Sequence, residues 1–163
     1  VTLDPDTANA RLLLARDGRG ATWSRVPQDL PQKAQRFDPS CCVLGARGFS
    51  GGRHRWEVAL GDDEGAWALG VARGSVRRKG WVDLLPREGI WALGRCGRRF
   101  RSFSAPETTI PAPETTLPAP GKLGRIQVSL DYMRGQVAFY FPGQKIPIFA
   151  FQNAAFDGEK IFP

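Results

Sequence analysis

Short runs in which apolar and polar residues alternate constrain this chain more than any other feature. In "RHRWEVAL" (53–60), Trp56, Val58 and Leu60 fall on one side of an extended strand, and the residues between them fall on the other. Comparable runs rich in Val, Leu, Trp, Phe and Tyr recur between clusters of Gly, Pro and Asp, whereas helical periodicity is weak throughout. The pattern predicts an all-β sandwich or barrel whose strands bury one face.

Two turns are predicted between the candidate strands. The charged, glycine-flanked "GDDEG" (61–65) predicts an exposed turn that joins the strands on either side of it as a hairpin. Gly135 in "DYMRG" predicts a second tight reversal, because glycine readily adopts positive φ. The candidate strands are 11–16, 41–44, 53–60, 67–72, 89–94, 98–103, 124–131, 136–141 and 146–152.

The length of the chain predicts one domain. A chain of 163 residues with 42% hydrophobic content can build one substantial core and is short for two. The first residues do not resemble a signal peptide, and no eighteen apolar residues follow one another. We therefore expect a soluble domain that does not insert into a membrane, although it can be cut from a larger protein.

Cysteine and histidine usage argues against disulfides and metals. Cys41, Cys42 and Cys96 cannot all pair within the chain, and adjacent cysteines rarely bridge each other. Reduced thiols in the cytoplasm fit this pattern best. With one histidine and no CxxC motif, a zinc site is not expected, and no cofactor is implied.

The excess positive charge is concentrated in residues 73–101. This segment holds nine basic and two acidic side chains, which accounts for the whole net charge of +7. The segment is interpreted as a solvated basic sheet edge or as a site for an acidic partner. RNA binding is a further alternative, disfavoured because no nucleic-acid motif accompanies the charge. The basic residues form two groups, expected to lie close together: Arg73, Arg77, Arg78 and Lys79, and then Arg95, Arg98, Arg99 and Arg101.

The sequence carries no pattern that indicates catalysis. His54 lacks a nucleophile motif such as GxSxG, so a structural or surface role is expected. Glu57, on the exposed side of its strand, is expected to pair with an arginine of a neighbouring strand. The glycines of "GARGFSGGR" do not have the spacing of a phosphate-binding loop. The chain is therefore not expected to be an enzyme.

Residues 105–120 contain an internal duplication. The unit APETTIP is followed by the near copy APETTLP. Because proline restricts itself and its predecessor to extended geometry, we expect an exposed, polyproline-like arm between two strands. A tolerated loop expansion is the favoured interpretation, and a docking peptide for a proline-binding module is the alternative.

Three sequence blocks together resemble one family. They are "LDPDTANARLLL", "GFSGGRHRWEVALG" and "VSLDYMRGQVAFYF", and "RFDPSCCVLG", "GVARGSVRRKGW" and "PREGIWALG" stand between them in the family's order. The chain resembles the PRY-SPRY (B30.2-type) domain of TRIM proteins and butyrophilins. The resemblance implies a bent sandwich of two antiparallel sheets, of the concanavalin-like jelly-roll type, with a PRY segment at 1–48 and a SPRY segment at 49–163. Relatives continue with one more apolar strand, so one sheet edge is expected to be unpaired.

The same resemblance implies a binding function. Domains of this family capture proteins, peptides or occasionally small anions, and ubiquitin-ligase catalysis belongs to a separate RING domain. The expected role is target recognition in a TRIM ligase or in the cytoplasmic part of a butyrophilin. The resemblance leaves open which parent applies, and whether an upstream coiled coil makes the intact protein a dimer.

Alignment with the family suggests the contact residues. Trp81 resembles an interface anchor, and both Trp81 and Trp23, in the first variable loop, are equally consistent with packing on the core, whereas Trp56, Trp67 and Trp91 are expected in the core. Ser40, Ala68 and Asp83 stand where phosphate-binding butyrophilins have basic or imidazole groups, which argues against a phosphate pocket. The predicted partner-binding residues are Ser40, Cys41, Cys42, Arg77, Arg78, Lys79, Trp81, Leu84, Gly94, Arg101 and Trp23.

Overall fold

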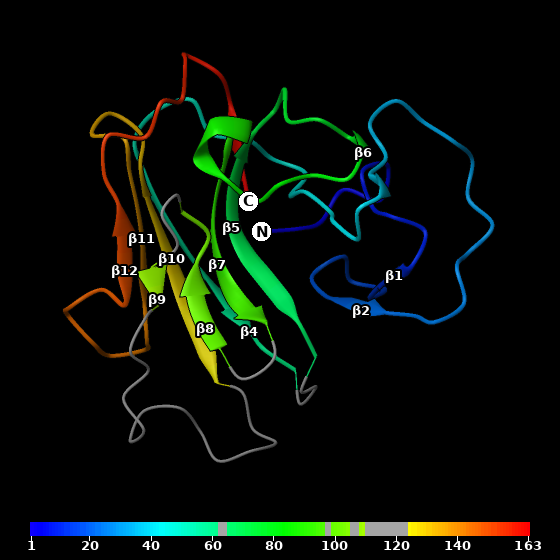
Figure 1. Ribbon diagram of the computed structural model, residues 1–163, viewed down its shortest axis with the longest axis horizontal. Coiled ribbons are helices and arrows are strands. Elements are labelled where there is room, and N and C mark those ends of the chain that lie inside the picture. Colours follow the sequence, from blue (N-terminus) through cyan, green and yellow to red (C-terminus); the bar gives the residue numbers. More distant parts are fainter. Residues whose placement is uncertain (62–64, 97–98, 105–107, 110–123) are drawn as a thin grey trace.

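Two antiparallel sheets packed face to face make up most of the molecule (Figure 1). The computed structural model describes residues 1–61, 65–96, 99–104, 108–109 and 124–163. One sheet has the strand order β12-β11-β10-β4, and the other has the order β13-β5-β7-β8-β9. Within the described ranges the only helix is the short 3-10 turn η1 (Pro86–Glu88), and no helix has the length and apolar content to cross a membrane. The predicted all-β class is confirmed.

Strand positions follow the sequence pattern closely. Eight of the nine predicted strands are present with boundaries shifted by a few residues, and five short strands of the described chain were not predicted. The four-stranded sheet contains β4 (Arg53–Ala59), β10 (Arg125–Asp131), β11 (Gln136–Tyr140) and β12 (Phe149–Phe151). The five-stranded sheet contains β5 (Trp67–Arg73), β7 (Ile90–Cys96), β8 (Arg99–Ser102), β9 (Thr108–Thr109) and β13 (Ile161–Phe162). Two small sheets pair β1 (Leu12–Leu14) with β2 (Ala21–Trp23), and β3 (Asp38–Pro39) with β6 (Lys79–Gly80).

The predicted strand at 41–44 is wrong. The backbone of this segment pairs with a turn near the N-terminus: the Asp4 N–H donates to the Leu44 carbonyl at 2.8 Å, and the Asn9 N–H donates to the Cys42 carbonyl at 3.0 Å. The Leu44 N–H donates to the Thr7 hydroxyl at 3.0 Å. Because a turn already satisfies these groups, the segment does not join a sheet, and its apolar side chains serve packing.

The predicted hairpin between residues 53–60 and 67–72 is also wrong. β4 pairs with β10 and β5 pairs with β7, so the two strands lie in different sheets. Alternation of side chains identifies the buried face of a strand but not its neighbour. The predicted reversal at Gly135 is confirmed, since β10 and β11 form a hairpin in which that glycine has a φ of 61°.

The main core lies between the two sheets. Its fully buried side chains include Leu93 of β7, Leu130 of β10 and Phe139 of β11. Trp91 is also buried, and Trp56 and Trp67 pack against the cluster, as predicted. Each large apolar side chain removed from water there contributes about 1.5–3 kcal/mol. The alternating burial along β10 shows why a period of two was visible in the sequence.

A second apolar cluster covers the other face of the five-stranded sheet. Ile90 and Ala92 of β7 point to this side, where Phe37 and Leu44 cover them. Both belong to the part of the chain that precedes β4, residues 1–52, which is called the N-terminal segment below. Val82, Leu84, Phe103, Cys42 and Phe162 pack around the cluster. The N-terminal segment is therefore attached to the outer face of this sheet by apolar burial.

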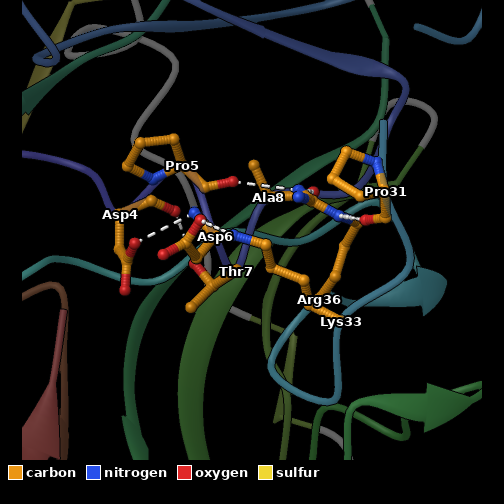
Figure 2. A network of polar contacts seen from close by, with 8 residues as sticks. All are labelled: Asp4, Pro5, Asp6, Thr7, Ala8, Pro31, Lys33 and Arg36. Atoms are coloured by element: carbon orange, nitrogen blue, oxygen red, sulfur yellow. Dashed lines mark hydrogen bonds and ion pairs between the residues drawn. The ribbon is translucent and has the colours of Figure 1, made fainter. Parts of the chain in front are cut away.

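Arg36 organises the N-terminal segment from inside (Figure 2). Its side chain is buried, yet its hydrogen-bond partners are backbone carbonyls: Nη1 donates to Pro5 at 2.9 Å and to Ala8 at 2.7 Å, and Nε donates to Pro31 at 3.0 Å. A guanidinium is well suited to this task because its five donors lie in a fixed plane. The residue ties together three stretches of chain.

The turn at residues 4–9 is pinned at its exposed edge as well (Figure 2). Lys33 Nζ lies 2.6 Å from an oxygen of Asp6, and this hydrogen bond, helped by the lysine charge, holds the pKa of Asp6 below its ordinary value. The Thr7 hydroxyl donates to the Asp4 carbonyl at 2.8 Å. These contacts fix the turn at residues 4–9, which is hydrogen-bonded to residues 42–44.

Arg78 and Lys79 join the N-terminal segment to the loop after β5. The Arg78 guanidinium donates to the carbonyls of Gln35 at 2.8 Å and Gly74 at 2.8 Å, and it lies 5.2 Å from the Phe37 ring centre. Lys79 Nζ donates to the Arg36 carbonyl at 2.8 Å. Burial lowers the pKa of Arg78, while the charge of Asp4 acts in the opposite direction. These two cations therefore hold the fold together.

We predict that Arg78→Ala destabilises the domain by about 2–4 kcal/mol, because several carbonyls lose a charged donor and the Phe37 ring loses its cover. Arg77→Ala is the matched control, since Arg77 makes one half-exposed ion pair to Glu88 at 3.6 Å and should cost less than about 1 kcal/mol. Urea unfolding of both variants measures the difference. Equal losses would show that Arg78 is an ordinary surface cation.

A second prediction concerns the close approach of β5 and β7. An added Cβ at Gly70 would lie 2.0 Å from the Trp91 carbonyl oxygen. Gly70→Ala must therefore separate the strands, and we expect a loss of about 1–3 kcal/mol or more in the free energy of unfolding. Gly51→Ala, where the new methyl meets no atom within 4 Å, should be close to neutral. A stable Gly70→Ala variant would contradict the observed strand spacing.

Candidate interaction surface

Two loops meet beside the second cluster. β3 and β6 run parallel, with Pro39 opposite Gly80, so Ser40 and Trp81 follow them side by side. The Ser40 hydroxyl is buried and accepts a hydrogen bond from the Val82 N–H at 3.0 Å. Ser40 therefore links the two loops through a buried hydrogen bond and does not face solvent. The structure brings the predicted segments 40–42 and 81–84 together.

The adjacent cysteines differ in environment. Cys41 is exposed, and its thiol donates to the Asn9 side-chain oxygen at 3.7 Å. Cys42 is half-buried against the second cluster. Burial, and to a lesser extent the neighbouring Cys41, raises the pKa of the Cys42 thiol to about 11. Cys42 therefore stays protonated near neutral pH, and of these two adjacent thiols Cys41 is the one presented to solvent.

Trp81 projects into solvent. Its side chain is 74% exposed, whereas Val82 and Leu84 in the same loop pack on the second cluster. Trp81 therefore does not pack on the core, and its role as an interface anchor stays a prediction. Trp23 is also exposed, by 56%, on β2 of the separate β1–β2 sheet (Figure 1).

Gly94 and Arg101 lie opposite each other on β7 and β8. The guanidinium of Arg101 lies 5.2 Å from the Phe103 ring centre, and a Cβ at Gly94 would come within 2.9 Å of the same ring. Phe103 also packs on the second cluster, as Leu84 does. Phe103 therefore connects the strand residues with the loops. Phe103 was not among the predicted contact residues, although a period of two places it on the same side of its strand as Arg101.

The basic segment is divided between the two ends of the five-stranded sheet. Arg95 pairs with Trp67 at the start of β5, and Arg77 follows the end of β5, so the two are about 20 Å apart along the strand. Arg99 of β8 lies opposite Cys96, the residue after Arg95 on β7, and Arg98 is outside the described residues. The two groups of cations therefore do not form one continuous patch, contrary to expectation.

At the C-terminal end of β5, hydrogen bonds and ion pairs engage several basic side chains, which reduces the positive charge available to a partner. Arg73 donates to the Ala155 carbonyl at 2.9 Å and lies 3.4 Å from Asp157. Arg78 and Lys79 are bound to carbonyls, as described above. Of the duplicated segment, the structure describes only Thr108 and Thr109, which pair with β8 as β9, so the predicted arm lies mostly outside the described residues.

The residues considered for catalysis have structural contacts. His54 stacks on Phe49 with ring centres 3.9 Å apart, and its Nε2–H donates to the Gly51 carbonyl at 2.7 Å. Glu57 pairs with Arg125 at 3.3 Å, as predicted. In the described part of the chain, no three His, Cys, Asp or Glu side chains are grouped to hold a metal ion.

Two known family models together match nearly the whole chain. The SPRY-associated domain (PRY) matches residues 1–49, and the SPRY domain matches residues 53–163. Human butyrophilin subfamily 1 member A1 is 38% identical over 97% of this chain, and human zinc finger protein RFP is 40% identical over 97%. Rat RING finger protein 39 is 41% identical over 100%. The chain spans 28%, 29% and 49% of the lengths of these relatives.

Solved structures share the fold. The crystal structure of the TRIM65 PSpry domain is similar over 99% of this chain and 80% of that chain, with a TM-score of 0.77 and 23% identity. Stonustoxin is similar over 99% of this chain and 26% of its own, with a TM-score of 0.77 and 22% identity. Together with the family matches, these findings show that the chain belongs to the PRY-SPRY family of TRIM proteins and butyrophilins, whose domains are non-catalytic protein-interaction modules.

Proposed function

We propose that this domain recognises a protein or peptide target through a loop surface, defined here as residues 40–42, 81–84 and 103 with Gly94 and Arg101. The observation that carries the proposal is the 74% exposure of Trp81 on a loop whose neighbouring side chains are packed. An aromatic side chain held out from an ordered base loses little conformational entropy on binding, which is the property of an interface hot spot. The parent is a TRIM-type ubiquitin ligase or a butyrophilin, acting in the cytoplasm.

The charge near Trp81 favours an acidic target. Arg77, with its side chain 49% exposed, lies on the loop that leads to Trp81, whereas Arg101 belongs to the cations nearer the start of β5 and borders the surface through Phe103. Such charges speed association with acidic segments more than they add affinity. Asp83 carries the opposite charge in the same loop, which disfavours a closely bound phosphate. A protein target is therefore favoured over the alternative of an anionic ligand or RNA.

We predict that Trp81→Ala lowers target capture at least tenfold in a crosslinking pull-down from cell lysate, because the anchor is removed. Met133→Ala is the matched control: Met133 is 81% exposed but lies at the β10–β11 turn. Arg77→Ala should weaken capture less and mainly at low salt. Capture that falls steeply with salt would favour RNA or phosphate contacts, and equal capture by the Trp81 and Met133 variants would contradict the proposed surface.

The cysteines provide a footprint of the same surface. At pH 8, a maleimide or iodoacetamide reagent should label Cys41 quickly and Cys42 slowly, because a thiol with a pKa of about 11 is thiolate in about one molecule per thousand. Labelling of Cys42 should rise as the pH approaches 11, since the reactive form is the deprotonated one. Bound target should protect Cys41 in the wild type and not in Trp81→Ala. Unchanged labelling of Cys41 in a saturated complex would place the contact elsewhere.

A further inference from the structure

Ser75 occupies an exposed position in the loop between β5 and β6. Its hydroxyl donates to one oxygen of Glu159 at 2.7 Å, and its backbone N–H donates to the other at 3.0 Å. Both hydrogen bonds lie at the surface, where water can replace them. One carboxylate thus ties this loop to the segment that precedes β13.

Cations surround Ser75 in the sequence. Arg73 stands two residues before it, and Arg77 and Arg78 stand two and three residues after it. Arg77 is the most accessible of the three, with a side chain that is 49% exposed and a long ion pair of 3.6 Å to Glu88. An exposed serine hydroxyl between arginines is the pattern that kinases with acidic substrate-binding clefts select.

We propose that Ser75 is a phosphorylation site for a serine/threonine kinase of this arginine-directed class. The Ser75 oxygen forms a bond to the γ-phosphorus of ATP, and the bond from that phosphorus to the β–γ bridging oxygen breaks, which releases ADP. The hydroxyl proton passes to the general base of the kinase. The product carries close to two negative charges beside Arg77.

Phosphorylation and the present contact with Glu159 exclude each other. The phosphorylated oxygen has no proton to donate, and its charge repels the carboxylate that now accepts two hydrogen bonds. Arg77 can turn from Glu88 toward the phosphate, since a charge-assisted hydrogen bond to a dianion is stronger than a long ion pair. Other ties remain, among them the Gly74 N–H to the Lys160 carbonyl at 3.0 Å. The expected result is a local rearrangement of the loop within a folded domain.

The loop that rearranges leads toward the proposed loop surface. Residues 74–78 connect β5 to β6, and Trp81 follows β6 directly. A change in target capture on phosphorylation rests on the proposed function, whereas the modification itself does not. The two are therefore tested by separate readouts.

The test incubates the folded domain with ATP and the catalytic domain of an arginine-directed kinase, and maps phosphate by mass spectrometry. We expect phosphate on Ser75, none in Ser75→Ala, slower incorporation in Arg77→Ala, and faster incorporation in Glu159→Ala, where the hydroxyl is released. Ser50, which is exposed and has Arg47 three residues before it and Arg53 three residues after it but no cation two residues away, is the internal comparison and should be modified less. The melting temperature of the phosphorylated domain should fall by about 2–4 °C.

Three outcomes would overturn the proposal. One is modification of a peptide of residues 70–82 but not of the folded domain, which would show that the fold withholds Ser75. Another is the absence of modification in both, which would show that the flanking cations do not form a recognition pattern. The third is preferential modification of Ser50. None of these outcomes depends on a target, so a failed target capture remains distinguishable from a failed modification.

Discussion

The five-stranded sheet must be covered on both faces, and the rest of the architecture follows from this constraint. Trp91 and Leu93 of β7 face the four-stranded sheet, while Ile90 and Ala92 face the N-terminal segment. A strand buried on both sides has no polar face, which explains why "IWALG" (90–94) is continuously apolar. The N-terminal segment is held in place by this apolar contact, and the loops of the interaction surface emerge at its border.

Part of the positive charge serves that attachment. Arg36 and Arg78 direct their guanidinium groups to backbone carbonyls, and Lys79 does the same with its ammonium group. Backbone carbonyls in irregular segments have no neighbouring strand to accept hydrogen bonds from, and long cationic side chains can donate to them instead. Part of the charge excess in residues 73–101 therefore serves to attach the N-terminal segment, and only the rest is available to a partner.

The packing of the loop beneath Trp81 determines how its exposed ring can act in binding. Ser40 holds the loop from inside, and Val82 and Leu84 pack on the second cluster, so the exposed ring stands on a base that does not need to reorganise. An exposed aromatic on a packed loop can bind with little ordering cost. The Ser75–Glu159 contact lies at the other end of the preceding loop.

The period of two and the turn residues were sufficient to locate most strands, to identify their buried faces and to place Trp56 and Trp91 in the core. These features are local, because successive side chains of a strand point to opposite faces whatever its neighbour is. The pairing of β4 and β5 with strands far along the chain, the exposure of Trp81 and the role of Phe103 were decided only in the tertiary structure. They depend on which residues far apart in the sequence come together in space. The backbone carbonyls that accept hydrogen bonds from an arginine cannot be recognised in the sequence, because every residue carries one.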